Sequence, residues 1–356
     1  MLNKISIENF RGFRSLQIED CKNFNLIIGK NNVGKTAFLE ALFLHIGSTN
    51  PELPTRINLF RGIGRILASA ESMWSPLFYN FDAGLKITIY SMEIKYKERK
   101  LEIRLASRDS VKLLRPKEKR EKGTEVSVLT STTPPDRIEL KYYNPQNEYT
   151  IAYAIIDEDG IRFENPRNSD MNGIFVISKG KGGGREDSER YGQLDSKGKT
   201  QDILDILKRI EPRLKRLLTV PIALGSDVHG DIGLGRSLPV QLMGEGTTKL
   251  LSLSLAITAV PNVIVLIDEI ENGLHYSVMK DVFEAIIELA NKYNVQIFAT
   301  THSNECVRSF FDAFNVLKSK ELSVIRLDRV DDEITAVPYD LEALSTVFET
   351  GWEIRG

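Results

Sequence analysis

A glycine-rich octapeptide near the N-terminus constrains the fold of this chain more than any other feature. It runs from Gly29 to Thr36, reads GKNNVGKT, and fits the pattern G-x-x-x-x-G-K-[ST] at every position. The apolar run Asn25–Ile28 precedes it and a helical pattern over Thr36–Ile46 follows it, which is the strand–loop–helix context that the pattern requires. A chance match is expected in roughly one chain in a hundred of this length. The octapeptide therefore predicts an α/β fold with a nucleotide-binding loop.

The residue types of this loop predict how it binds phosphate. Glycines let the backbone turn its N–H groups inward around an anion, and the following helix adds the positive end of its dipole. We expect Lys35 to reach the β- and γ-phosphates of ATP, and the Thr36 hydroxyl to bind Mg²⁺. The expected nucleotide-binding residues of the loop are Gly29, Asn31, Asn32, Val33, Gly34, Lys35, Thr36 and Ala37.

Two later segments carry polar residues at the ends of apolar runs. Val263–Ile267 reads as a buried strand and ends in the carboxylates Asp268 and Glu269. In P-loop enzymes the first carboxylate completes the Mg²⁺ shell, and a second one can deprotonate the attacking water. Val295–Thr300 reads as the next strand, with His302 just beyond it. A histidine there can reach the γ-phosphate, although a lone histidine is more often structural.

A second glycine-rich turn precedes a long apolar helix. It contains Gly244, Glu245, Gly246 and Thr247, and a helix N-terminus of this kind can bind an anion. Because the chain already has a phosphate loop, the turn suggests a site that faces the γ-phosphate bound by another subunit. The alternative is an ordinary capped turn.

Taken in order, these motifs resemble the ABC-type ATPases of the SMC and RecF kind. Within them, the segments IENFRGF, GKNNVGKT, LMGEGTTKLL, LIDEIENGLHYS and FATTHS are most similar to the small OLD-like AAA ATPases. The resemblance covers residues 1–47 and 238–304. It implies a P-loop NTPase of the ABC/RecF type, with a mixed central sheet flanked by helices, an antiparallel β lobe and a variable helical insertion.

The same resemblance implies a set of roles. It implies that ATP and Mg²⁺ are bound in a sandwich of two subunits, a homodimer or a higher homo-oligomer. Thr36 and Asp268 would bind the metal, Glu269 would be the catalytic base, and His302 would sense the γ-phosphate. The turn from Gly244 to Thr247 would face the phosphates of the partner subunit. Arg11 lies where this family often contacts the nucleotide.

Three departures refine the resemblance. The signature reads GEGTT rather than the LSGGQ of transporters, which argues against a transporter subunit. The glutamine that usually contacts the metal has no clear equivalent. The chain ends soon after His302, so we expect no carboxylate-rich TOPRIM nuclease domain. A nuclease or other effector would then be a separate chain.

Patterning suggests three parts along the 356 residues: 1–47 and 238–356 as the two parts of the ATPase domain, and 48–237 as an inserted β/α lobe. Alternating segments over 84–164 predict antiparallel strands. Residues 178–200 are rich in Gly, Ser and charge, which predicts a mobile loop. Residues 201–218 read as helical, with Pro212 starting a second segment.

Composition limits the environment and the partners. The net charge of −2 excludes a globally basic nucleic-acid coat, but residues 95–122 hold 12 Lys/Arg against 5 Asp/Glu and could track the phosphates of DNA. A charge run of this kind is usually a solvated face. The two cysteines cannot frame a disulfide scaffold, so a cytoplasmic location is expected. Residues 250–267 are nearly uncharged, but Pro261 and Asn262 split them, which favours helix, turn and strand over a membrane span.

Three functions remain open. The first is a dimeric ATPase switch in an antiphage defence system, working with a separate effector such as a nuclease. The second is a DNA-repair ATPase of the RecF or SMC type, although residues 48–237 hold too little heptad sequence for a coiled-coil arm. The third is a nucleotide-gated scaffold that barely hydrolyses ATP.

Overall fold

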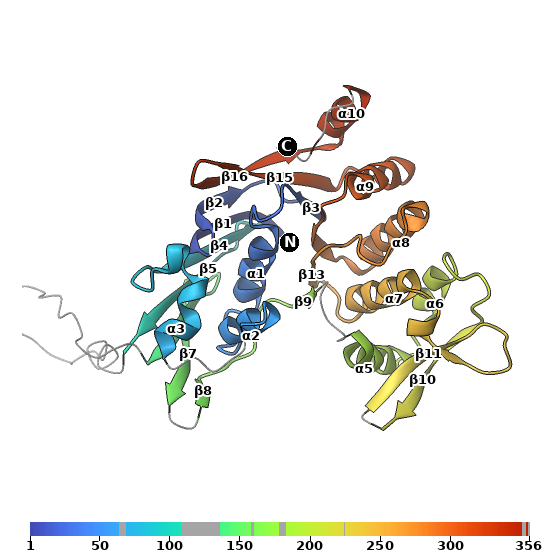
Figure 1. Cartoon of the computed structure of the whole chain (residues 1–356), viewed down its shortest axis with the longest axis horizontal. Helices are drawn as coiled ribbons and strands as arrows, with labels where there is room; N and C mark the ends of the chain where they lie inside the picture. The colour runs from blue at the N-terminus through green and yellow to red at the C-terminus, as the bar shows by residue number, and fades with distance from the viewer. Residues whose placement is uncertain are drawn as a thin grey trace, which may run out of the picture. The chain divides into compact units, whose positions relative to one another are not determined.

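The computed structural model describes residues 1–63, 69–107, 136–157, 160–177, 183–223, 225–350 and 354. The chain divides into two compact units (Figure 1). The first unit comprises residues 1, 18–39 and 171–356, and the second comprises residues 2–17 and 40–170. The division at residues 47 and 237 that patterning suggests stays a prediction.

A six-stranded sheet, counted over the described residues, forms the centre of the first unit. Its strands, in spatial order, are β16 (Glu333–Tyr339), β15 (Leu322–Val330), β3 (Phe24–Ile28), β14 (Gln296–Thr300), β13 (Ile264–Ile267) and β9 (Gly173–Val176). Neighbouring strands are parallel from β15 to β9, while β16 and β15 form an antiparallel hairpin. The expected mixed central sheet is confirmed.

Helices cover both faces of this sheet, which explains why its inner strands are continuous apolar runs. Helices α7 (Glu245–Thr258), α8 (Tyr276–Tyr293) and α9 (Asn304–Val316) follow one another along one face (Figure 1). On that side Phe24 of β3 contacts Phe314 of α9, with ring centroids 5.5 Å apart. On the other face Phe298 of β14 contacts Phe38 of α1 (Lys35–Ile46). Every residue of β3, β13 and β14 is consequently buried.

The parallel order of these three strands positions the predicted motifs. The carboxyl ends of parallel strands meet at one edge of a sheet, where ligands of open α/β sheets bind. The phosphate loop follows β3, Asp268 and Glu269 follow β13, and His302 follows β14. The fold therefore brings three segments that are far apart in sequence to one edge.

Helix α5 (Gly183–Asp195) occupies much of the segment predicted to be a mobile loop, so that prediction was wrong for residues 183–195. Pairs one helical turn apart, such as Arg185 with Glu189, support the helix. Asp187 and Ser188 are buried, and Asp187 accepts a hydrogen bond from Ser252 of α7. Burial raises the pKa of Asp187 to about 6. Tertiary contacts thus outweigh the local composition. Residues 178–182 lie outside the described residues.

A three-stranded antiparallel sheet within the described residues corrects a second prediction. Helix α6 (Gln201–Leu207) forms as expected, but the chain beyond Pro212 enters β10 (Arg216–Ile222) rather than a helix. Strand β10 pairs with β11 (Gly225–Asp231), which pairs with β12 (Leu238–Pro239). The β-branched residues Thr219, Val220 and Ile222 favour a strand. A short 3₁₀ turn (Val240–Leu242) and helix α10 (Leu341–Thr350) complete the named elements of this unit.

The second unit is built on a seven-stranded sheet, as far as the described residues show. Its strands, in spatial order, are β2 (Phe13–Ile18), β1 (Leu2–Phe10), β4 (Ile87–Glu93), β5 (Glu98–Ala106), β6 (Arg137–Tyr143), β7 (Tyr149–Asp157) and β8 (Gly160–Glu164). From β1 to β8 the pairs are antiparallel, which confirms the antiparallel section expected over 84–164. Its short helices are α2 (Leu53–Phe60), α3 (Ala70–Trp74) and the 3₁₀ turns Ser75–Leu77 and Tyr79–Phe81. Residues 108–122 of the basic stretch lie outside the described residues.

The uncharged segment 250–267 folds as helix, turn and strand, as expected. Its residues divide between α7 and β13, with the turn at Pro261 and Asn262. Among the described residues, no helix is both long and apolar enough to span a bilayer.

Candidate functional site

The phosphate loop connects β3 to α1 through a backbone that only certain residues can adopt. Gly29 has φ of 137° and Gly34 has φ of 104°, and Asn32 is left-handed at 62°. A Cβ on Gly29 would lie 2.4 Å from the backbone oxygen of Leu327, so no other residue fits there. The glycine spacing of the motif is therefore a requirement of this backbone.

Lys35 begins helix α1 and folds back over the loop. Its Nζ donates to the backbone oxygens of Gly29 (2.7 Å) and Lys30 (3.0 Å). The ammonium therefore lies over the anion-binding turn. Val33 and Ala37 are buried and anchor the loop, while the side chains of Asn31 and Asn32 are exposed.

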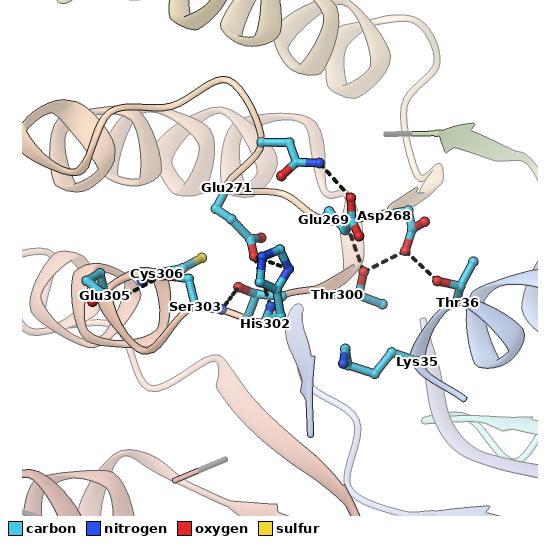
Figure 2. Close-up of polar contacts among 12 residues, drawn as sticks. Lys35, Thr36, Asp268, Glu269, Glu271, Thr300, His302, Ser303, Glu305 and Cys306 are labelled. Atoms are coloured by element: carbon cyan, nitrogen blue, oxygen red, sulfur yellow. Dashed lines mark hydrogen bonds and ion pairs between the residues drawn. The ribbon is translucent and has the colours of Figure 1, made fainter. Parts of the chain in front are cut away.

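A chain of hydrogen bonds joins the phosphate loop to the carboxylates after β13 (Figure 2). The Thr36 hydroxyl donates to Asp268 Oδ1 at 3.0 Å. The same oxygen accepts from the Thr300 hydroxyl at 2.7 Å, and Thr300 Oγ1 accepts from the backbone N–H of Glu269 at 2.8 Å. Asp268 is 8% exposed. Thr300, the last residue of β14, thus links that strand to both Asp268 and Glu269.

Glu269 occupies a strained position. Its φ is 49°, in the left-handed region that a residue with a long side chain rarely adopts. Asn272 Nδ2 donates to Glu269 Oε2 at 2.6 Å. The side chain is partly exposed, unlike that of Asp268. The turn thus directs one carboxylate inward to Thr36 and keeps the other within reach of water.

His302 lies beyond β14 and contacts a carboxylate that the sequence prediction left outside the main site. Glu271 Oε1 accepts from the His302 backbone N–H at 2.9 Å and lies 3.1 Å from Nδ1 (Figure 2). The His302 side chain is 51% exposed and that of Glu271 is 6% exposed. Ser303 then caps helix α9 by accepting from the Cys306 N–H.

The second glycine-rich turn caps helix α7. Gly244 is its N-cap residue, with φ of 116°, and Gly244 and Glu245 are exposed. A Cβ on Gly246 would make only ordinary contacts, the nearest 3.7 Å from the Gly273 oxygen. The turn therefore lies beside the turn that follows Glu269, while Thr247 is buried beneath it.

Lys249, one turn into α7, is near enough to the carboxylates of the site for its charge to interact with theirs. Burial lowers the pKa of its ammonium, against the opposing influence of negative charge nearby. That negative charge belongs to Glu271, Asp268 and Glu269. The helix that follows the second glycine-rich turn thus contributes a cation to the carboxylate cluster.

Arg11 lies in the turn between β1 and β2, where its φ is 50°. Its Nε lies 2.6 Å from Glu40 Oε2, and its other nitrogens donate to the Asn58 side chain and the Pro76 oxygen. Burial lowers the pKa of the guanidinium to about 10, while Glu40 acts in the opposite direction. These contacts all lie within the second unit, and a role of Arg11 toward nucleotide stays a prediction.

The donor set fits Mg²⁺ and a nucleoside triphosphate. A hydroxyl and a carboxylate oxygen meet at Thr36 and Asp268, and Mg²⁺ prefers oxygen ligands, with one or two carboxylates supplementing water and phosphate oxygens. The Lys35 ammonium lies over the loop backbone and supplies a positive charge for phosphate. These residues together match the requirements of a triphosphate–magnesium site.

Sequence reasoning assigned no role to Thr300, Asn272 or Lys249, and it considered Glu271 only as an alternative to Glu269 as the base. Thr300 reads as part of an apolar strand, although a polar residue in its last position is a usable signal. Asn272 follows Glu269 by three residues, the spacing of one turn. Glu271 and Lys249 lie within the quoted segments LIDEIENGLHYS and LMGEGTTKLL, but only their tertiary contacts reveal what they do.

Comparisons with known proteins agree with this geometry. Residues 24–308 match the family described as "AAA domain, putative AbiEii toxin, Type IV TA system". A Helicobacter pylori (strain ATCC 700392 / 26695) protein named ATP/GTP phosphatase is 22% identical over 328 residues, which is 86% of each chain. The DNA replication and repair protein RecF of Actinobacillus pleuropneumoniae (serotype 5b, strain L20) is 50% identical over 42 residues, only 12% of each chain.

Among solved structures, the chain is similar in fold to the SMC head bound to the C-winged helix domain of ScpA. The TM-score is 0.51 at 12% identity, and the match covers 97% of this chain and 99% of that chain. At this identity the likeness concerns the fold alone. It agrees with the expected ABC/RecF-type arrangement of a P-loop sheet.

Proposed function

The chain belongs to the AAA domain family matched over residues 24–308 and is an ATPase, and on that premise we propose that it works as an ATP-driven switch that closes as a homodimer. In this proposal two subunits enclose two nucleotides, and the closed state acts on a separate effector. The likeness to a protein named ATP/GTP phosphatase, over 86% of each chain, supports hydrolysis rather than binding alone.

One observation carries the proposal: the hydrogen-bond chain from Thr36 through Asp268 and Thr300 to Glu269. Thr36 belongs to the phosphate loop, whereas Glu269 follows a strand that is distant in sequence. The series of hydrogen bonds therefore fixes the position of Glu269, the candidate base, relative to the phosphate site. Catalysis of phosphoryl transfer is mostly positioning and charge stabilisation. The hydrogen bonds between the phosphate loop and the carboxylates after β13 would supply this positioning.

Each residue has a defined task in this proposal. Thr36 and Asp268 would hold Mg²⁺, which when bound neutralises charge on the β- and γ-phosphates. Lys35 would add a second positive charge over the loop. Glu269 would orient water through its free oxygen and accept the water's proton, while Asn272 fixes the other oxygen at 2.6 Å. His302 would contact the γ-phosphate.

The dimer is proposed from the turn at residues 244–247, of which Gly244 and Glu245 are exposed. The turn ends in the N-terminus of α7, which provides backbone N–H groups and positive dipole for an anion. A Cβ on Gly244 would meet nothing within 4 Å, which leaves room at the start of the turn for close approach of a second molecule. We propose that this turn completes the site of the partner subunit.

The biological setting is proposed as antiphage defence, with a nuclease-like chain as the effector and the OLD-like ATPases as the subgroup. The family description refers to a toxin–antitoxin system, which supports a protein that acts with a second component. The segment shared with RecF favours one alternative, a DNA-repair ATPase. Measuring ATP turnover with and without DNA distinguishes these possibilities, because only a DNA-dependent enzyme should be stimulated.

Glu269→Gln tests the proposed chemistry directly. The amide keeps the size and hydrogen bonding of the side chain but cannot accept a proton, so ATP hydrolysis should fall by about 100-fold or more. ATP binding, measured by calorimetry, should persist, and light scattering should show an ATP-dependent dimer that accumulates. Glu288→Gln, on the exposed side of α8 where Glu288 pairs with Arg209, is the matched control and should hydrolyse ATP normally. Hydrolysis at the parental rate by Glu269→Gln would show that Glu269 is not the base.

A further inference from the structure

Glu271 is the buried carboxylate nearest to His302, and its two oxygens differ in their surroundings. Oε1 receives the His302 backbone N–H and lies within hydrogen-bond distance of Nδ1 of the same residue. Oε2 is buried and has no hydrogen-bond partner among the described residues. The described hydrogen bonds of this carboxylate therefore all go to His302, just beyond β14, and the carboxylate is too enclosed to orient a water molecule.

A buried, half-satisfied carboxylate is costly unless nearby charge offsets it. Lys249 of α7 supplies a positive charge that interacts with Glu271. The protonated form of His302 would supply another. A neutral Gln at this position could accept the His302 backbone N–H without the cost of a buried charge. The charged Glu271 therefore indicates a role beyond holding the backbone.

The contact also determines which nitrogen of His302 is available. A carboxylate only accepts hydrogen bonds, so Nδ1 must carry the proton in this pair. The opposite nitrogen, Nε2, lies on the far side of the ring from this contact, and the His302 side chain is 51% exposed. Without Glu271, this carboxylate no longer selects which of the two nitrogens carries the proton.

We propose that Glu271 is a positioning residue that holds the His302 ring so that Nε2 faces the γ-phosphate. This inference rests on the proposed function, because it needs a phosphate for Nε2 to contact. When both ring nitrogens are protonated, Nε2–H donates to a phosphate oxygen while Glu271 balances the charge at Nδ1. Glu269 stays the base, and Glu271 acts only through His302.

The proposal makes the effects of Glu271 and His302 non-additive. Loss of a carboxylate that orients a metal-binding histidine costs about 10- to 100-fold in affinity or activity, and we take this as the scale for His302. We expect Glu271→Ala to lower kcat for ATP hydrolysis by such a factor, with KM for ATP within threefold of the parental value. His302→Ala should lower kcat similarly, and the double variant should be no worse than His302→Ala alone.

Two further measurements separate positioning from folding. Glu271→Gln retains an oxygen that can accept both N–H groups, so it should recover part of the kcat lost in Glu271→Ala. In protein labelled with ¹⁵N-histidine, the His302 signal should report a protonated Nδ1, and Glu271→Ala should abolish that preference. If Glu271→Ala fails to fold, Glu271→Gln replaces it in the double-variant cycle. Glu305→Gln, which alters an exposed carboxylate three residues from His302 on α9, should leave kcat unchanged.

The outcomes identify which idea fails. Losses from Glu271→Ala and His302→Ala that multiply in the double variant overturn the positioning role and leave the ATPase intact. A His302 signal without an Nδ1 proton in the parental protein overturns it as well. Absence of hydrolysis by the parental protein overturns the proposed function, and this inference with it.

Discussion

Replacing Lys35 by alanine should weaken ATP binding by an amount that the structure allows us to work out. Two unit charges about 4 Å apart near a protein surface interact by about 4 kcal/mol. In the structure the ammonium already donates to the Gly29 and Lys30 oxygens. Each such bond given up on moving to phosphate subtracts about 1 kcal/mol. The remaining 2–3 kcal/mol corresponds to a Kd roughly 30- to 160-fold weaker.

The fold should survive this change. Lys35 is the first residue of α1, and alanine is the best helix former. The loop keeps its glycines, so its N–H groups should still bind phosphate weakly. Circular dichroism and the thermal midpoint should match those of the parental protein, which confines the effect to nucleotide binding.

Titration calorimetry with a slowly hydrolysed ATP analogue and Mg²⁺ gives the Kd directly. Lys30→Ala is the matched comparison, because Lys30 belongs to the same loop but is exposed. Its loss should cost under about 1 kcal/mol, the range of screened surface charges. A Lys35→Ala variant that binds within threefold of the parental Kd would refute the assignment of Lys35 to the phosphates.

Two other predictions concern α7 and its surroundings. Gly246→Arg should bind ATP with near-parental affinity, because a Cβ there makes only ordinary contacts, yet it should neither dimerise nor hydrolyse ATP. Mixing this variant with Lys35→Ala subunits should restore partial ATPase activity. If heterodimers form and no activity returns, that result counts against a site shared between subunits. Asp187→Asn should raise the thermal midpoint at pH 7.5 but not near pH 4. Because the pKa of Asp187 rises from 3.8 to about 6 on folding, the parental protein loses up to about 3 kcal/mol of folding stability as pH rises between those two values. A thermal midpoint of Asp187→Asn at pH 7.5 that is equal to or below the parental one would contradict this effect.

Local sequence was sufficient wherever a short segment determines its own conformation. The octapeptide from Gly29 to Thr36 predicted strand, loop and helix, because its glycines are needed at backbone angles that other residues avoid. The apolar run that precedes Asp268 predicted a buried strand. Since parallel strands share an edge for their carboxyl ends, the meeting of the motifs followed from the same reasoning.

Local sequence failed where distant contacts outweigh composition. Gly, Ser and charge over 178–200 suggest a loop, but Asp187 and Ser188 become buried, and Asp187 contacts Ser252 of α7, so a helix forms. Beyond Pro212 the segment joins β11 and becomes a strand. Both outcomes depend on partners that lie far along the chain, which a window of adjacent residues cannot include.

The sequence by itself determined which chemistry this chain carries: a phosphate loop, two carboxylates after a strand and a histidine after the next. Only the tertiary structure decided how these groups are connected. Thr36 meets Asp268 across 232 positions of sequence, and Glu271 turns toward His302 rather than toward water. Residue type limits what a side chain can do, whereas hydrogen-bond partners and burial, which arise only when distant strands align, decide what it does.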